Sequence, residues 1–170
     1  MLNTNFSPWP DYSNEEAIAI KKVLLSNKVN YWTGSECRQF EKEFSSWVGT
    51  KYAVALANGT LALESALKAL EIISGDEVIV TSRTFIASVS SIINVGATPI
   101  FADIDVDSQN ITASTIREKI TKKTKAIVCV HLSGWPCEMD EIMQLAREFK
   151  LSVIEDCAQA HGAKYKGKSV

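Results

Sequence analysis

Two adjacent carboxylates, Glu155 and Asp156, follow directly on the apolar run that begins at Leu151. Side chains alternate along a strand, so we expect these two carboxylates to point to opposite faces of a sheet. An α/β sheet usually binds its ligand at the carboxyl ends of its strands. A carboxylate at the end of a buried strand is costly unless it meets a cation. The sequence therefore predicts a cationic ligand facing one of these two side chains.

A second motif, Ala57-Asn58-Gly59-Thr60, lies between an expected strand and the helical sequence LALESALKAL. Unpaired amides at a helix start, together with the positive end of the helix dipole, favour an anion. Gly59 lets the backbone approach a phosphate, and the Thr60 hydroxyl adds a donor. The motif matches neither the dinucleotide nor the nucleoside triphosphate glycine pattern. The alternative interpretation is an ordinary turn with a polar helix cap.

Two further side chains follow expected strands. Phe85 comes after the strand EVIVT, where it either stacks on a flat ligand or anchors the next helix in the core. His131 ends another strand, and a single histidine in such a place is usually structural. We expect no metal site, because the acidic run Asp103–Asp107 lacks the glycine and glutamate of a calcium loop. No recognised zinc spacing relates Cys129, His131, Cys137 and Cys157.

Three features are expected at one edge of one sheet: a phosphate site at Gly59 and Thr60, the aromatic ring of Phe85 and the strand-end Asp156. A phosphate, a flat ring and a basic ring nitrogen together describe pyridoxal 5'-phosphate. An aspartate beside the pyridine nitrogen favours its protonated form. The protonated ring is an electron sink for the carbanion of an amino acid. We therefore expect this cofactor, with Asp156 facing its ring nitrogen.

The elements that position these residues alternate along the chain. Two helices come first: one runs from Asn14 to about Ser26 behind a Ser13/Glu16 capping box, and the next carries Phe40, Phe44, Trp47 and Val48. Strands are then expected at Tyr52–Ala57, Glu77–Thr81, Thr98–Asp103, Ala126–Leu132 and Leu151–Asp156. Helices are expected at Leu61–Ile72, Phe85–Val95, Ala113–Ile120 and Met139–Phe149. This alternation predicts an α/β fold, a mostly parallel sheet with helices on both faces.

Composition excludes several classes of partner. The 170 residues carry a net charge of −2, which gives no electrostatic reason to bind nucleic acid or an anionic membrane. The apolar runs are too short to span a bilayer, and the segment MLNTNFSPWPDY does not resemble a secretory signal. Four cysteines without a CxxC pair are typical of reduced thiols, so we expect a cytoplasmic protein.

The sequence resembles the DegT/StrS-type sugar aminotransferases, within the fold-type I group of pyridoxal-phosphate enzymes. The resemblance extends over nearly the whole chain and rests on the order and spacing of several motifs. These motifs are residues 31–34 (YWTG), 57–63 (ANGTLAL), 75–80 (GDEVIV), 83–88 (RTFIAS), 95–97 (VGA), 122–127 (KKTKAI), 130–134 (VHLSG) and 155–162 (EDCAQAHG).

The resemblance implies a role for particular residues. Gly59 and Thr60 would hold the phosphate, Phe85 would stack on the ring, and Asp156 would pair with the ring nitrogen. Gln159 would lie near the phenolic oxygen of the ring. The loop Trp32-Thr33-Gly34 would approach the sugar. The implied activity is transfer of an amino group, typically from glutamate, to a nucleotide-linked keto-sugar used for surface polysaccharides or antibiotics.

The resemblance also implies a Schiff-base lysine beyond the Asp-x-x-Gln motif, and the sequence does not reach it. No lysine present offers a substitute, so we assign no catalytic residue. Residues 1–170 are expected to be a partial large domain, inactive alone, with a helical segment at 1–50 and an alternating strand and helix part at 51–170.

Two alternatives to the aminotransferase stay open. One is a catalytically inactive remnant that binds pyridoxal phosphate or phosphate. The other is a pyridoxamine-phosphate-dependent sugar dehydratase of the same family, in which a histidine replaces the lysine. The expected partners are small molecules, a nucleotide-sugar and an amino acid donor, and the family implies a homodimer for the full-length form.

Overall fold

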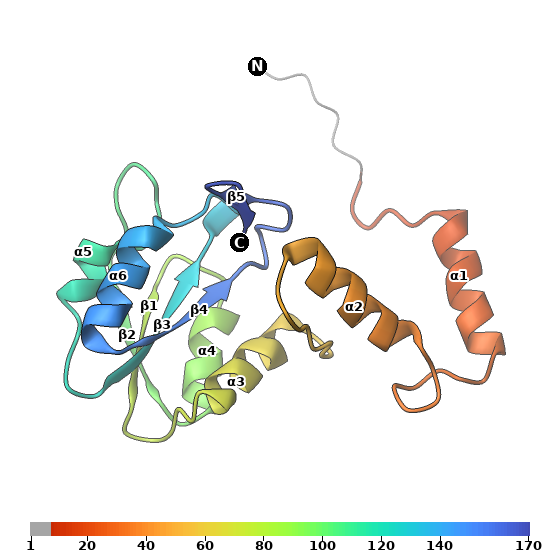
Figure 1. The fold of residues 1–170 in the computed structure, drawn as a ribbon, viewed down its shortest axis with the longest axis horizontal. Helices are drawn as coiled ribbons and strands as arrows, with labels where there is room; N and C mark the ends of the chain where they lie inside the picture. Colours follow the sequence, from red (N-terminus) through yellow and green to blue (C-terminus); the bar gives the residue numbers. More distant parts are fainter. Residues whose placement is uncertain (1–7) are drawn as a thin grey trace, which may run out of the picture. The chain divides into compact units, whose positions relative to one another are not determined.

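The computed structural model describes residues 8–170, which divide into two compact units at Ala55 and Leu56 (Figure 1). Each unit is described by itself. The first seven residues, part of the segment in which we expect no secretory signal, lie outside the described residues.

The first unit contains the two predicted N-terminal helices, α1 (Asn14–Leu25) and α2 (Glu36–Val48). The predicted capping box is present: Ser13 N–H donates to Glu16 Oε2 at 2.6 Å, and Glu16 N–H donates to Ser13 Oγ at 3.2 Å. Helix α2 ends at Gly49, whose φ of 84° is the left-handed conformation that commonly terminates helices.

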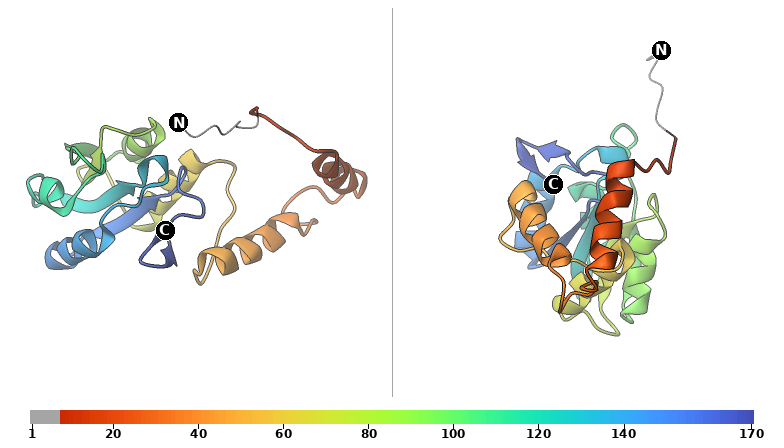
Figure 2. Two further views of the ribbon diagram at one scale, coloured as in Figure 1. Left: turned by 90° about the horizontal axis from the view of Figure 1, so that it is seen from above. Right: turned by 90° about the vertical axis from the view of Figure 1, so that its right-hand side faces the viewer.

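The second unit is built around a four-stranded parallel sheet in the order β2-β1-β3-β4. Its strands are β1 (Glu77–Thr81), β2 (Thr98–Ala102), β3 (Thr124–Val130) and β4 (Ser152–Asp156). The chain leaves β1 for β2 on one side and then continues through β3 to β4 on the other. Figure 2 gives two further views of the ribbon. The strand order therefore reverses between β1 and β3, and their carboxyl ends form the crevice where such sheets bind ligands.

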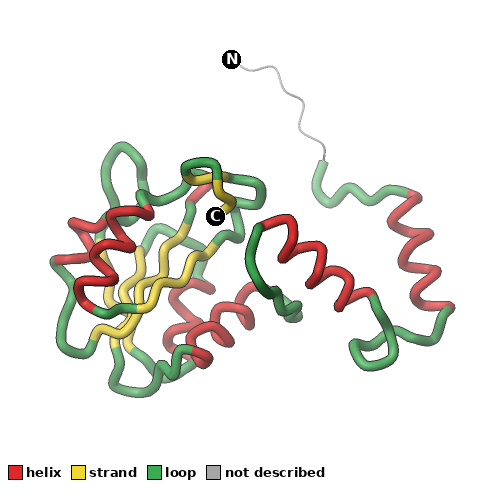
Figure 3. The backbone as a smooth tube through the Cα atoms, viewed as in Figure 1, coloured by secondary structure: helices red, strands yellow, loops and turns green. Residues whose placement is uncertain are grey.

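Helices cover both faces of this sheet (Figure 3). On one face α5 (Ala113–Arg117) and α6 (Met139–Phe149) bury Ile116, Ile142 and Leu145 against Ile79 and Ile127. On the other face α3 (Gly59–Ala69) and α4 (Ala87–Asn94) bury Leu67 and Ile92 against Val78, Val80 and Val128. The predicted fold class, α/β with a mostly parallel sheet covered on both faces, is confirmed.

Several predicted boundaries change. Helix α3 begins at Gly59 and ends at Ala69, earlier at both ends than expected. Strand β3 ends at Val130, so His131 lies in the turn that leads into a 3₁₀ turn, η1 (Leu132–Gly134). The last residues form a small hairpin, β5 (Lys164–Tyr165) and β6 (Lys168–Ser169), around the turn at Gly167.

The predicted strand at Tyr52–Ala57 is wrong in the described chain, because no strand forms there. A strand needs a neighbour to bond its amides and carbonyls, and the described residues supply none. The alternating apolar side chains that suggested the strand are exposed, with Tyr52 at 74% and Val54 at 75%.

Candidate active site

The two carboxylates at the end of β4 diverge as the strand alternation predicted. Glu155 Oε2 lies 2.9 Å from His131 Nε2 on one side of the sheet. Asp156 Oδ2 accepts a hydrogen bond from the Ser88 hydroxyl of α4, on the other side, at 2.6 Å. Asp156 is half-buried rather than fully buried, because β4 is an edge strand of the described sheet.

Both oxygens of Asp156 are held by the protein. Besides the Ser88 bond to Oδ2, the N–H of Ala158 donates to Oδ1 at 3.2 Å. A carboxylate offers about four acceptor sites, so these two bonds leave room for a further donor. The arrangement presents an oriented carboxylate at the carboxyl edge of the sheet.

The start of α3 lies in the motif predicted to bind phosphate. Asn58 caps the helix, since its Oδ1 accepts from Leu61 N–H at 3.0 Å and its carbonyl accepts from Ala62 N–H at 3.1 Å. The amides of Gly59 and Thr60 precede these and have no intrahelical partner. The first turn of α3 carries no acidic side chain to compete for them. The polar cap of the alternative interpretation is therefore present, and it leaves two amides for an anion.

Gly59 has no internal structural need to be glycine. Its φ is not in the left-handed region, and a Cβ built on it would meet no protein atom within 4 Å. The space that a Cβ would enter at this position is therefore open. Without a side chain here, a phosphate can approach the backbone at the start of α3 closely.

Phe85 lies in the turn between β1 and α4, and its side chain is 69% exposed. The alternative interpretation, an anchor for α4 in the core, is therefore wrong. An exposed ring at the carboxyl edge of the sheet is free to stack on a flat ligand.

Gln159 is oriented by the turn that follows β3. Its Oε1 accepts a hydrogen bond from Ser133 N–H at 2.8 Å. Ser133 reaches this position with a left-handed φ of 54°. Because the carbonyl oxygen of the side chain is engaged, its NH₂ group is the part that can donate to an oxygen of a ligand.

His131 has a structural role. Its ring is fully buried, and Nδ1 accepts from the N–H of Cys137 at 3.0 Å. The ring proton therefore lies on Nε2, which donates to Glu155. These two bonds tie both ends of the turn between β3 and α6 to the sheet.

The thiols of Cys137, which is buried, and Cys157, which is half-buried, are poor nucleophiles. Burial, with the charge of Glu155 adding to it, raises the pKa of the Cys137 thiol to about 12. Burial and the charges of Glu155 and Asp156 also raise the pKa of Cys157 to about 12. Both thiols are protonated at neutral pH. Within residues 8–170, no three His, Cys, Asp or Glu side chains lie together so as to hold a metal ion.

The loop predicted to approach the substrate belongs to the first unit and is organised by Asn30. Asn30 Oδ1 accepts from Trp32 N–H at 3.0 Å, from Thr33 N–H at 3.0 Å and from the Thr33 hydroxyl at 3.1 Å. A Cβ on Gly34 would lie 2.5 Å from the Lys28 carbonyl oxygen, so the loop itself requires this glycine. The Trp32 side chain is 83% exposed.

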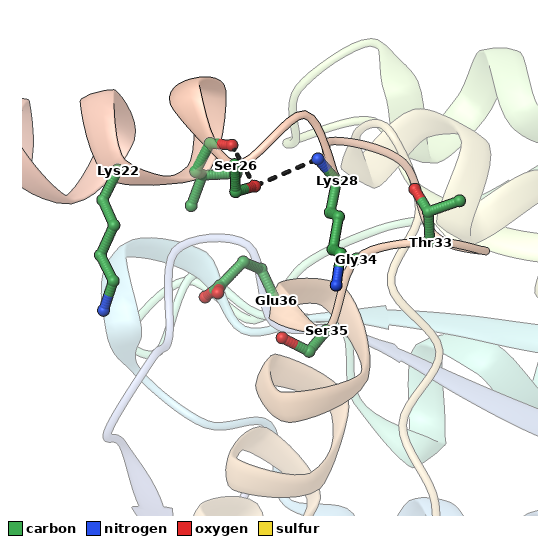
Figure 4. Close-up of a pocket in the computed structure, with 8 residues that line it drawn as sticks. Lys22, Ser26, Lys28, Thr33, Gly34, Ser35 and Glu36 are labelled. Atoms are coloured by element: carbon green, nitrogen blue, oxygen red, sulfur yellow. Dashed lines mark hydrogen bonds between the residues drawn. The ribbon is translucent and has the colours of Figure 1, made fainter.

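Thr33 and Gly34 line a hollow of about 300 Å³ between α1 and the start of α2 (Figure 4). Lys22, Lys28 and Ser35 are among the residues that line it, although most of its exposed wall is apolar. Trp32 does not line this hollow. The structure therefore brings two of the three predicted substrate residues to one concave surface.

Three supporting residues escaped prediction from the sequence. Ser88 and Thr84 are spaced i, i+4 across the start of α4, and Asn30 stands two residues before Trp32. The last spacing is a recognisable turn signal. The partner of Ser88 is Asp156, 68 residues further along the chain, and no local pattern identifies it.

A parallel sheet with reversed strand order and an oriented carboxylate at the end of β4 is typical of α/β domains that bind a ligand at this edge. The sequence identifies the family: residues 10–170 match the model of the DegT/DnrJ/EryC1/StrS aminotransferase family, to which this chain belongs.

Individual relatives agree with this assignment. The chain is 49% identical over 160 residues to GDP-perosamine synthase of Escherichia coli O157:H7, covering 94% of the chain and 42% of that protein. The structure of the aminotransferase from Psychrobacter cryohalolentis matches with a TM-score of 0.95 and 64% identity, over 98% of this chain and 42% of that one. NtdA of Bacillus subtilis, solved with bound cofactor PMP, matches with a TM-score of 0.83 and 33% identity, over 94% and 39% of the respective chains. The chain thus spans less than half the length of these relatives.

Proposed function

We propose that the protein containing this chain is a pyridoxal-phosphate-dependent aminotransferase that aminates a nucleotide-linked keto-sugar, with glutamate as amino donor. The observation that carries the proposal is the Asp156 carboxylate, held on both oxygens at the carboxyl end of β4. The similarity to a GDP-perosamine synthase over 94% of the chain supports the substrate class.

The residues fit the cofactor. The lack of a side chain at Gly59 and the unpaired amides of Gly59 and Thr60 suit its phosphate. The unused acceptor sites of Asp156 suit a protonated pyridine nitrogen. When bound, pyridoxal phosphate supplies an electron sink for the carbanion of the amino acid.

The chain's own groups have separate tasks in this proposal. Asp156 keeps a proton at the ring nitrogen by electrostatic attraction and hydrogen bonding. Phe85 covers one face of the ring and excludes water from it. Gln159 donates its NH₂ group to the phenolic oxygen, since Ser133 fixes the other end of its amide. The loop at Trp32, Thr33 and Gly34 takes the sugar substrate.

Transfer of isotopic nitrogen tests the proposal. The protein that carries this chain is incubated with pyridoxal phosphate, ¹⁵N-labelled glutamate and a GDP-linked keto-sugar, and the sugar nucleotides are analysed by mass spectrometry. We expect ¹⁵N in an amino-sugar nucleotide, and its loss in an Asp156→Ala variant.

Other outcomes of this experiment have definite meanings. Loss of water from the sugar without nitrogen transfer would establish the dehydratase instead. Absence of both reactions, with binding of the cofactor or of phosphate retained, would indicate the catalytically inactive remnant. A panel of nucleotides in place of GDP defines the nucleotide specificity.

We propose that the partners of the protein are small molecules, that the protein is cytoplasmic, and that it forms a homodimer. No helix within residues 8–170 is long and apolar enough to cross a bilayer. All four cysteines are free thiols, which suits a reducing compartment.

Helix α1 of the first unit has an exposed apolar surface that favours association of two copies. It buries no residue and exposes Ile18, Ile20, Leu24 and Leu25. Sedimentation across a concentration range tests this, and a monomer at every concentration would contradict it.

A further inference from the structure

A chain of hydroxyl groups connects the start of α4 to the carboxylate at the end of β4. Ser88 is fully buried, and its Oγ lies 2.6 Å from Asp156 Oδ2. On its other side, Thr84 Oγ1 lies 2.8 Å from the same Ser88 oxygen. Thr84, Ser88 and Asp156 therefore form one connected network.

The direction of each bond in this network follows from the donors available. An ionised carboxylate only accepts hydrogen bonds, so Ser88 must use its single hydroxyl proton to donate to Asp156. Ser88 then has no proton left for Thr84, and Thr84 donates to Ser88. The chain runs Thr84 to Ser88 to Asp156 and leaves Ser88 one preferred orientation.

A serine is an expensive choice for this position unless its hydroxyl is needed. Serine has a lower helix propensity than alanine, and burying a hydroxyl costs free energy unless it is bonded. The buried neighbours Ala87 and Ile92 on the same helix are apolar. Ser91 is also buried, but its hydroxyl bonds locally to the Ser88 carbonyl at 3.5 Å and does not reach β4.

The same turn carries the exposed ring of Phe85, between Thr84 and Ser88. The Phe85 ring and the hydroxyl that bonds to the Asp156 carboxylate thus come from one short segment. Movement of this segment would shift both groups that flank the proposed cofactor ring.

We propose that Ser88, oriented by Thr84, is a positioning residue that holds the Asp156 carboxylate toward the ring nitrogen of the cofactor. This inference rests on the proposed function. Without the Ser88 hydroxyl, Oδ2 loses its short bond and only the longer bond from Ala158, at 3.2 Å, restrains the carboxylate. Recognition of the ring nitrogen then weakens, while the phosphate site at Gly59 and Thr60 is unchanged.

Two ligands that differ only at the ring nitrogen test the proposal. Pyridoxamine 5'-phosphate and its 1-deaza analogue, in which C–H replaces the nitrogen, are titrated into the protein and their Kd values are measured by fluorescence. Loss of a hydrogen bond to a charged group costs about tenfold in affinity or more. We expect Ser88→Ala to raise the Kd for pyridoxamine phosphate about tenfold and the Kd for the deaza analogue less than about twofold.

Matched variants separate positioning from damage to the fold. Ser88→Thr keeps the hydroxyl and should restore the preference for the nitrogen-containing ligand. Ser91→Ala removes the other buried hydroxyl of α4 and should leave both Kd values unchanged. Thr84→Val leaves Ser88 in place and should reduce the preference for pyridoxamine phosphate over the deaza analogue, by a smaller factor than Ser88→Ala does. This variant therefore tests the network even where Ser88→Ala folds poorly.

The remaining outcomes overturn one proposal or both. If the wild type prefers pyridoxamine phosphate and Ser88→Ala keeps that preference in full, the positioning role is refuted and the proposed function stands. An equal rise in the Kd of both ligands in Ser88→Ala would also refute the positioning role, since damage to the fold weakens the binding of both ligands alike. If the wild type itself shows no preference between the two ligands, the pairing of Asp156 with a ring nitrogen fails, and the positioning role fails with it.

Discussion

Replacement of Gly59 by alanine is expected to weaken cofactor binding without weakening the fold. The added Cβ meets no protein atom within 4 Å, and the backbone is not in the left-handed region. Alanine is favoured over glycine in helices by up to about 1 kcal/mol, partly because glycine leaves the unfolded chain more freedom. The ligand-free variant should therefore be as stable as the wild type or slightly more so, by about 2–4 °C in Tm for each kcal/mol.

We expect the same methyl group to limit how closely a phosphate can approach the backbone at the start of α3. A phosphate displaced from the amides of Gly59 and Thr60 loses charge-assisted hydrogen bonds, each worth about 1.5–3 kcal/mol. Loss of one such bond weakens binding about 10- to 100-fold. Thermal unfolding without ligand and titration with pyridoxamine phosphate measure the two effects separately.

Gly49→Ala is the matched control. A Cβ at Gly49 also meets open space, but its φ of 84° is left-handed. Alanine there should cost about 1–2 kcal/mol of stability and leave the Kd for pyridoxamine phosphate unchanged. The reasoning is refuted if Gly59→Ala lowers the Tm, or if it binds pyridoxamine phosphate as tightly as the wild type.

Substitutions at three further positions test the supporting structure. His131→Ala should lower the free energy of unfolding by about 3 kcal/mol or more, since it leaves the Cys137 N–H unpaired and opens a cavity. His131→Asn keeps an acceptor near that N–H and should lose less; equal losses in urea unfolding would contradict this. The unfolded thiol of Cys137 ionises near its ordinary pKa of 9.0, and the folded one near 12. Between these values the folded state holds the extra proton, so stability should fall as pH rises, by at most about 1.4 kcal/mol per pH unit. Cys137→Ala should remove that component of the slope, and an unchanged slope would exclude Cys137 as its source. Gly34→Ala should force apart the Lys28 carbonyl and the loop and broaden Trp32 fluorescence; an unchanged spectrum would show that the loop accommodates a side chain.

The fold was predictable because its signals are periodic and local. Helix α6 has the predicted bounds, Met139–Phe149, since its apolar residues recur at helical spacing on one face. Strand β1 also has its predicted bounds, and four of its five residues are buried. Where burial was missing, as at Tyr52 and Val54, the same kind of pattern produced no strand.

The candidate site was predictable only in part. Strand alternation alone separated Asp156 from Glu155, and the helix start at Gly59 follows from a turn motif. The exposure of Phe85 did not follow, because an aromatic residue after a strand suits a core as well as a ligand. The bond from Ser88 to Asp156 joins residues far apart in sequence and required the packing of α4 against the sheet.

The groups of the proposed site in the second unit are held by bonds within the protein. The Ser88 hydroxyl and the Ala158 N–H orient Asp156, the Ser133 N–H orients Gln159, and the Asn58 side chain caps the start of α3. A ligand that meets groups already in position spends little free energy on ordering them, so more of its contact energy appears as affinity. Ser88 and Asn58 provide this support with their side chains, and Ala158 and Ser133 provide it with their backbone amides. Substitution of Ser88 or Asn58, whose side chains provide the support, should therefore change affinity through geometry alone, whereas Asp156→Ala removes the charge itself.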